Sequence, residues 1–320
     1  MILLNSRNII QHVNFFELLT GFSIIKISGM DNQQYLQNHI TTDIFKLKSG
    51  KHILCGNCNS HGRINSTLRL FHNKHDYFYL QRSSICDIQI TELMKYAVFS
   101  KVKITKLKNY SFLGVIGPKA KSVLLSHFPY LPNHITSIVF FQDVIILWFD
   151  QPILRFLLIV KNKQLQSLTT RLYKNNIANI KNYWFFLDIS IGIPIIEKPV
   201  FQKFFPQELN LDILGGLDFH KGCYCGQEMI SKIHFKNLNN KKLFCLVGTV
   251  NSVIDIFSLI EIYIHGNWKK VGCTIFYLKV MSNIFLLQCM LNINRIQSNI
   301  FRLASDQTSV LSMLDTHTRI

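Results

Sequence analysis

The segment from Lys221 to Glu228, with the sequence KGCYCGQE, brings a thiol, an ammonium group, two glycines and a carboxylate together within eight positions. Lys221 lies two residues from Cys223 and would favour its thiolate if the fold brought the two side chains together. Gly222 and Gly226 permit positive φ and a close backbone approach on either side of the cysteine. A free cysteine between glycines is also typical of a turn around a small buried side chain. Taken alone, the segment indicates a reactive loop or a structural turn with equal weight.

Two further cysteines, Cys55 and Cys58, have the CxxC spacing of a redox dithiol or of half a zinc site. No second CxxC pair or His-x3-His element accompanies them, and they fall in an expected strand rather than at a helix N-terminus. A structural role is therefore favoured, and no metal site is predicted. Cys223 and Cys225 are separated by one residue, a spacing that rarely closes an unstrained disulfide.

Two aromatic residues, Phe22 and Trp184, could stack on a flat heterocycle, although large aromatic side chains more often belong to the core. One basic segment, interleaved with a histidine and a phenylalanine, is the best local candidate for contact with a phosphate backbone. A solvated surface is an equally good interpretation of it. The segment comprises Lys232, His234, Phe235, Lys236, Lys241 and Lys242.

The chain is strongly basic, with 35 Lys and Arg against 18 Asp and Glu in 320 residues, a formal net charge of +17. Such a balance is compatible with RNA or another polyanionic partner. The chain is also rich in Ile, Asn, Lys and Phe, which AT-rich codons encode, so mutational bias could supply many of the lysines. A hydrophobic content of 48% with 17% charged residues is typical of a globular protein rather than a disordered one.

The location expected from the sequence is cytoplasmic, without membrane association. The first twenty residues lack a basic start followed by an apolar block. The most apolar region, residues 135–160, is interrupted by polar and charged side chains and by proline, which indicates consecutive strands rather than a bilayer span. The eight cysteines are too dispersed for a disulfide scaffold, so reduced thiols are expected.

The hydrophobic pattern predicts an N-terminal α/β module over residues 1–108, a second α/β module over 109–237 that ends in the KGCYCGQE loop, and a C-terminal β-barrel over 238–320. Met229, Ile230 and Ile233 recur at helical spacing, so the loop is expected to lead into a short amphipathic helix. The expected strands of the first module lie at 22–28, 52–57, 63–71, 76–81 and 101–107, those of the second at 111–116, 137–141, 144–149 and 154–160, and those of the barrel at 243–250, 259–264, 268–277, 284–290 and 300–303.

The segment KGCYxGQE resembles the signature of the YgfZ family, folate-binding proteins involved in tRNA modification. The resemblance covers nearly the whole chain and extends to four other stretches. These are Thr91–Leu93, Lys95–Val102, Pro206–Gln207 and Leu214–Gly216. It implies a relative of the aminomethyltransferase of the glycine cleavage system. The implied fold class is α+β, with aminomethyltransferase-like folate-binding α/β modules and a small C-terminal β-barrel.

The resemblance also implies a tetrahydrofolate derivative as cofactor. Carried over by position, the family's folate-contacting tryptophans fall on Phe22 and Trp184. Phe22 keeps an aromatic face but lacks the indole N–H donor. The motif cysteine is Cys223, which becomes the candidate reactive thiol with Lys221 as the residue that tunes it. Cys225 occupies the variable position of the signature.

Ser66 and Thr67 stand where aminomethyltransferases place an acidic pair. Without that carboxylate, proton transfer from an aminomethyl donor lacks its base. The resemblance therefore implies an accessory or regulatory protein, expected to be monomeric, that supports iron–sulfur-dependent tRNA-modifying enzymes through its cysteine. A folate-dependent one-carbon transferase is the alternative. The expected partners are folate and, directly or indirectly, tRNA or the enzymes that modify it.

Overall fold

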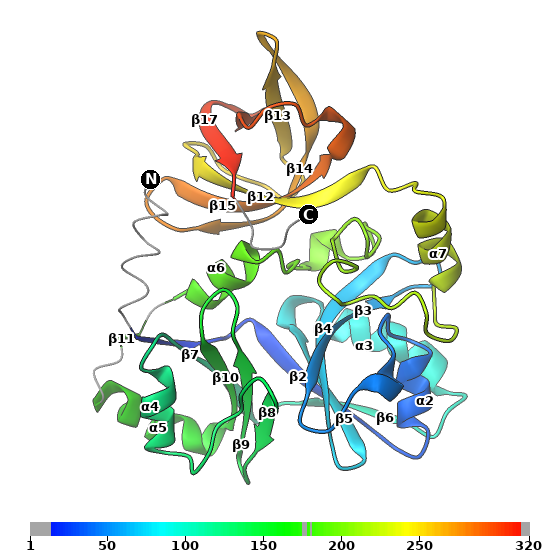
Figure 1. The fold of residues 1–320 in the computed structure, drawn as a ribbon, viewed down its shortest axis with the longest axis vertical. Coiled ribbons are helices and arrows are strands. Elements are labelled where there is room, and N and C mark those ends of the chain that lie inside the picture. Colours follow the sequence, from blue (N-terminus) through cyan, green and yellow to red (C-terminus); the bar gives the residue numbers. More distant parts are fainter. Residues whose placement is uncertain (1–13, 175–177, 180, 315–320) are drawn as a thin grey trace.

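The computed structural model describes residues 14–174, 178–179 and 181–314, which form two β-sheets side by side with a closed barrel above them (Figure 1). Mixed helices and strands with a six-stranded closed barrel at the C-terminal end confirm the predicted α+β fold class. Among the described residues, no helix is long and apolar enough to cross a membrane.

The first sheet has five strands, each antiparallel to its neighbours. In spatial order they are β3 (His52–Cys58), β4 (Ile64–Asn73), β5 (Asp76–Arg82), β2 (Phe22–Ser28) and β6 (Lys103–Leu107). Helices α2 (Asn32–Gln37) and α3 (Ser83–Ala97) pack on one face of this sheet. Successive side chains of β2 point to opposite faces of the sheet, so both faces of the strand are buried. Ile25 and Ile27 contact the helices, while Ile24 points to the opposite face.

The second sheet has six strands. In spatial order they are β11 (Ala178–Asn179), β1 (Phe15–Leu18), β7 (Tyr110–Ile116), β10 (Arg155–Lys161), β9 (Val144–Phe149) and β8 (Ile138–Phe140). Helices α4 (Ala120–Leu125) and α5 (Asn162–Lys174) cover its outer face. The sequence pattern did not predict β1, which pairs antiparallel with β7 and so adds residues from the start of the chain to the second sheet.

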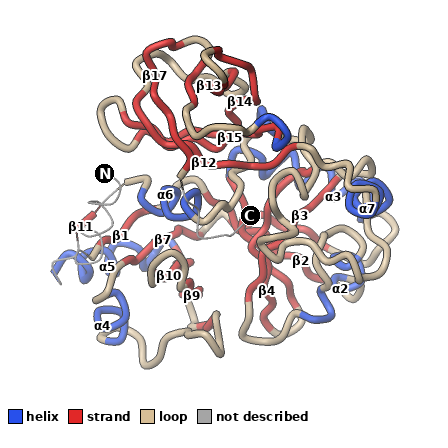
Figure 2. Tube along the Cα trace, turned by 45° about the horizontal axis from the view of Figure 1, so that its top comes forward, coloured by secondary structure: helices blue, strands red, loops and turns tan. Residues whose placement is uncertain are grey.

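The two sheets pack against each other through their remaining faces. A buried cluster joins Ile24, Phe71 and Leu80 of the first sheet to Leu147 and Leu157 of the second. Helix α6 (Tyr183–Ser190) lies between this junction and the barrel (Figures 1 and 2). The junction is therefore lined by strands from both modules and closed from above by one helix.

The barrel follows helix α7 (Gln227–Phe235), which lies on the outer flank of the molecule (Figure 1). Its strands are β12 (Lys241–Thr249), β15 (Ile284–Asn292), β14 (Asn267–Lys279), β13 (Leu259–Ile264), β16 (Phe301–Leu303) and β17 (Asp306–Met313). The sequence pattern predicted all of these strands except β17. Short 3-10 turns complete the elements, at Ile44–Lys46, Lys198–Val200 and Ile293–Arg295.

A histidine at the junction of the two sheets predicts a specific acid sensitivity. Burial lowers the pKa of His52 to about 3, and its Nε2 lies 3.0 Å from the carbonyl oxygen of Trp148 while Nδ1 is buried without a partner among the described residues. The unfolded chain therefore binds a proton near pH 6.5 that the folded protein takes up only near pH 3. The folded state therefore has its full stability with respect to His52 above pH 6.5. As the pH falls from 6.5 towards 4, the free energy of unfolding decreases by on the order of 3 kcal/mol.

Urea unfolding of the parent and of His52→Gln between pH 7 and pH 4 measures this effect. The glutamine variant should lose less stability on acidification, because its amide does not titrate. His75→Gln, at an exposed position, provides the matched control and should follow the parent. Equal acid sensitivity of the parent and His52→Gln would contradict the assignment.

Candidate functional site

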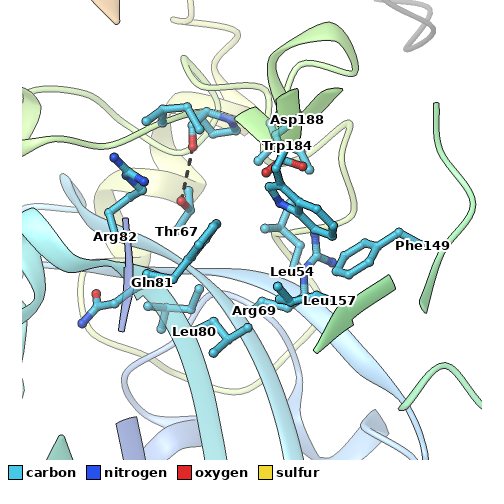
Figure 3. A pocket seen from close by; sticks show the side chains of 15 residues that line it. Leu54, Thr67, Arg69, Leu80, Gln81, Arg82, Phe149, Leu157, Trp184 and Asp188 are labelled. Carbon is cyan, nitrogen blue, oxygen red and sulfur yellow. Dashed lines mark hydrogen bonds between the residues drawn. The ribbon is translucent and has the colours of Figure 1, made fainter. Parts of the chain in front are cut away.

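A pocket open to solvent lies where the two sheets meet beneath α6 (Figure 3). Strands β2 to β5 supply one wall, β9 and β10 the other, and the segment after α6 completes it. Phe22 and Trp184, the two predicted folate contacts, both line this pocket. The structure therefore brings together two residues that are 162 positions apart in the sequence.

The aromatic wall of the pocket is rigidly held. The backbone N–H of Trp184 donates to Glu17 Oε2 at 2.7 Å, and that of Asn182 donates to Glu17 Oε1 at 2.6 Å, so the carboxylate of β1 fixes the start of α6. Gly114 makes room for the indole, because a Cβ at this position would lie 2.7 Å from Trp184 Cε3. Phe149 packs edge-on against the same indole at 5.5 Å between ring centroids. A flat ligand would therefore meet a preformed aromatic surface.

Three charged side chains line the pocket beside this surface, Arg69, Arg82 and Asp188, and Arg82 is paired with Glu197. Asp188, one turn after Trp184, accepts a hydrogen bond at Oδ1 from Arg155 Nη2 at 2.7 Å. The guanidinium of Arg155 is fully buried and lies 4.3 Å from the centroid of the Trp184 ring. Arg69 of β4 has no hydrogen bond or ion pair within the part of the chain that the structure describes, and its guanidinium faces Phe149 at 5.3 Å. Burial lowers the pKa of Arg69 to about 10, which leaves it charged at neutral pH.

The position expected to carry the acidic pair lies at the same pocket. Thr67 lines it and donates from Oγ1 to the carbonyl oxygen of Pro194 at 3.3 Å, whereas Ser66 is fully buried. Asp188 is the carboxylate among the lining residues, and it is already bound by Arg155. The pocket can thus hold a flat ligand with polar and anionic groups, but its carboxylate is committed to an ion pair rather than poised for proton transfer.

The KGCYCGQE loop occupies a different place, on the flank where α7 begins. Gly226 caps α7 with a φ of +83°, and a Cβ there would lie 2.7 Å from Gly62 N and 2.4 Å from Asn59 O. The prediction that this position needs a glycine, for a positive φ and a close backbone approach, is therefore confirmed for Gly226. It is wrong for Gly222, which does not adopt a left-handed backbone and would meet nothing within 4 Å if it carried a Cβ.

Lys221 points into the protein. Its Nζ donates to the carbonyl oxygens of Gln37, Ile40 and Thr42 at 2.6, 2.7 and 3.1 Å. These bonds use all three N–H donors of the ammonium group, so none remains for the sulfur of Cys223. Burial lowers the pKa of Lys221 to about 8. The side chain ties the loop to the C-terminal end of α2.

Among the eight free cysteines, Cys223 is the exposed one. Cys225 is half-buried, and burial raises its pKa, an effect that a hydrogen bond with Tyr96 partly offsets. Cys55 and Cys58 are buried in β3, and burial raises the pKa of Cys55 to about 12. No group of three or more potential metal ligands occurs in the described residues.

Neither Cys223 nor Lys221 is among the residues that line the pocket. The structure thus separates the predicted site residues into an aromatic pocket with Phe22 and Trp184 and an exposed thiol with a buried lysine behind it. Sequence reasoning missed Arg69 and Asp188. The i, i+4 spacing of Trp184 and Asp188 on a helix was the signal available for the second of these.

Lys221 offers a test that distinguishes a structural role from a tuning role. Lys221→Met keeps most of the apolar stem but removes all three hydrogen-bond donors, leaving three carbonyl groups to find new partners. We expect the free energy of unfolding to fall by about 3 kcal/mol, measured by urea titration. The pH dependence of Cys223 alkylation in the folded protein, followed by peptide mass spectrometry, should stay unchanged. A shift of that profile to higher pH with unchanged stability would support the tuning role instead.

Comparison with known proteins gives consistent matches along the chain. The family model described as "GCVT N-terminal domain" matches residues 2–142. Curated relatives named "tRNA-modifying protein YgfZ" include one from Buchnera aphidicola subsp. Schizaphis graminum, 39% identical over 286 residues that cover 89% of this chain and 90% of the relative. One from Buchnera aphidicola subsp. Baizongia pistaciae is 38% identical and covers 93% of both chains. One from Yersinia enterocolitica is 34% identical, over 92% of this chain and 89% of the relative.

A solved structure agrees with the fold. The glycine cleavage system aminomethyltransferase T from Bartonella henselae superimposes with a TM-score of 0.78, covering 97% of this chain and 87% of that protein. The sequence identity is 14%, so the likeness concerns the fold alone.

Proposed function

Because this chain belongs to the YgfZ family, we propose that it is a folate-binding accessory protein in tRNA modification. The matched relatives are named tRNA-modifying proteins, which supports the cellular role. The observation that carries the folate part is the aromatic-walled pocket in which the half-buried Arg69 has no hydrogen-bonding partner among the described residues. Such a guanidinium has N–H donors free to bind an oxygen atom of a ligand, in addition to its contact with Phe149.

The residues of the pocket fit the chemistry of a folate. Its pterin ring is flat and would stack against Trp184 and Phe22. Asp188 has a second carboxylate oxygen that Arg155 does not use, and it would accept from an N–H edge of the ring. Arg69 would bind a carbonyl or carboxylate oxygen of the ligand. Bound tetrahydrofolate derivatives supply a one-carbon unit, whereas the residues of this chain supply binding and orientation.

Cys223 is proposed as the reactive thiol through which the protein supports iron–sulfur-dependent tRNA-modifying enzymes. Its exposure favours contact with a partner molecule, because a thiol at the surface can be reached without unfolding. Since the cysteine lies outside the pocket, the ligand and the thiol act at separate places on the molecule. The partners are then folate in the pocket and tRNA, or an enzyme that modifies it, at the surface.

Ligand titration tests the pocket. We expect tetrahydrofolate or its 5-formyl derivative to quench tryptophan fluorescence, and Trp184→Phe to abolish most of the quenching while retaining binding by calorimetry. Phe22→Ala should weaken binding about tenfold through lost stacking, at roughly 1 kcal/mol or more. Arg69→Met, which keeps the apolar stem, should weaken it about tenfold or more because a charge-assisted hydrogen bond is lost.

Trp148→Phe is the matched control for the fluorescence signal, because Trp148 does not line the pocket. It should leave both the quenching and the affinity close to the parent values. Absence of binding at millimolar ligand would contradict the folate proposal. Transfer of a one-carbon unit from an aminomethyl donor, detected by mass spectrometry, would favour the transferase alternative.

Cys223 is tested separately from the pocket. Cys223→Ser should fail to complement a tRNA-modification defect, while its folate affinity stays within twofold of the parent. Cys225→Ser is the matched control, two residues away in the same loop, and should complement. Full complementation by Cys223→Ser would remove the thiol from the proposed function.

A further inference from the structure

Helix α7 has two clearly different faces. Ile230 and Ile233 are buried against the loops beneath the helix, whereas Lys232, Phe235 and Lys236 are exposed. Residues spaced by three and four positions share one face of a helix, so the two lysines and the phenylalanine lie together on the outer side. Figures 1 and 2 show α7 on the flank of the molecule with no other element covering it.

The exposed face carries an excess of positive charge, although Glu228 in the first turn of α7 lies four residues before Lys232 on the same face. From Met229 to Ile254 the sequence contains no Asp or Glu, and the segment holds Lys232, Lys236, Lys241 and Lys242. None of the four forms an ion pair within the described part of the chain, although eleven such pairs occur elsewhere in it. The lysines therefore outnumber the nearby carboxylates, which are Glu228 of the same helix and Glu208, whose pKa is raised by burial and partly lowered again by the charge of Lys241.

An aromatic ring stands in the middle of this charge. Phe235 is 73% exposed and Leu238 after it is 56% exposed, so neither is explained by the core. The neighbouring His234 stacks on Phe219 with 3.7 Å between ring centroids, which braces the end of the helix. The edge of Phe235 meets the same imidazole at 5.1 Å, so one part of its ring is held while the rest faces solvent.

We propose that this surface, formed by Lys232 and Phe235 of α7, Lys236 directly after it, and Lys241 and Lys242 of β12, binds RNA directly. Exposed aromatic rings flanked by cations are the arrangement that binds single-stranded segments, because bases stack on the ring while lysines contact phosphates. An acidic protein segment could satisfy the lysines but would leave the ring without a flat partner. The choice of tRNA as the RNA rests on the proposed function.

The position of the surface relative to Cys223 adds to its meaning. The cysteine lies three residues before the Gly226 cap of α7, and α7 has nine residues. At about 1.5 Å per residue the helix is roughly 14 Å long, so the exposed thiol and Phe235 lie near its opposite ends. RNA bound along α7 would thus run past the exposed cysteine and leave the folate pocket free.

Binding of unmodified tRNA to the full-length protein, measured by fluorescence anisotropy at several salt concentrations, tests the proposal. Lys232→Ala/Lys236→Ala should weaken binding at least tenfold and lower the slope of log K against log salt by about two, one for each lost phosphate contact. Lys119→Ala/Lys121→Ala removes the same charge from exposed positions at the start of α4, on the opposite side of the molecule, and should change the affinity by less than twofold. Unfolding midpoints verify that each variant is folded.

The ring is tested with a second pair of variants. Phe235→Leu keeps an apolar side chain but removes the stacking face, and should weaken binding about tenfold with an unchanged salt slope. Phe235→Tyr keeps the face and should bind within twofold of the parent. Because Phe235 is exposed, neither change alters the core.

Four outcomes would overturn the proposal. The first three are that the parent does not bind tRNA, that the α7 and α4 lysine variants weaken binding equally, and that Phe235→Leu binds as tightly as the parent. The fourth is that the α7 variants still bind tRNA but no longer bind an acidic protein, which would make the surface a protein-binding site. Folate affinity of the same variants is measured in parallel. If the parent protein binds tRNA through α7 but does not bind folate, the folate proposal is rejected and the RNA-binding proposal is retained.

Discussion

The buried ion pair between Arg155 and Asp188 is the interaction on which the pocket depends. Arg155 is fully buried, so its charge requires a partner, and Asp188 supplies one at 2.7 Å. The same guanidinium supports the Trp184 ring and donates to the Trp184 carbonyl oxygen at 3.3 Å. Together with Glu17 at the start of the helix, the pair fixes α6 over the junction of the two sheets. A pocket wall made from three distant segments is thereby held in place.

The pocket and the KGCYCGQE loop are separate, but one hairpin contacts both. Strand β4 carries Thr67 and Arg69 into the pocket, and the turn that joins β3 to β4 packs Gly62 against Gly226 at the start of α7. The close approach leaves no room for a side chain at Gly226, so the loop cannot shift without moving the turn. This hairpin links the pocket to the flank that carries the thiol.

How far the sequence predicted the structure differs from element to element. Strands rich in apolar residues, such as β2, β9 and β13, were placed at their observed bounds. Strand β1 has only four residues and its partner β7 is nearly a hundred positions away, so no local pattern indicates it. The family resemblance predicted Phe22 and Trp184 as folate contacts, and the structure shows that both line one pocket. The direction of Lys221 could not be inferred, because its three acceptors belong to a segment about 180 positions away.

The net charge is another property that the sequence alone could not interpret, and the structure helps because it shows where the lysines lie. AT-rich codons can raise the number of lysines anywhere in a chain, so a charge of +17 does not by itself indicate a polyanionic partner. Several lysines elsewhere lie beside carboxylates, as in the pairs Lys26–Asp76, Lys106–Asp87 and Lys161–Asp143. Around the exposed ring of Phe235, by contrast, Lys232, Lys236, Lys241 and Lys242 form no ion pair among the described residues, and Glu228 is the acidic residue of α7. The arrangement of the charge, rather than its sum, is what distinguishes a binding surface from a compositional trend.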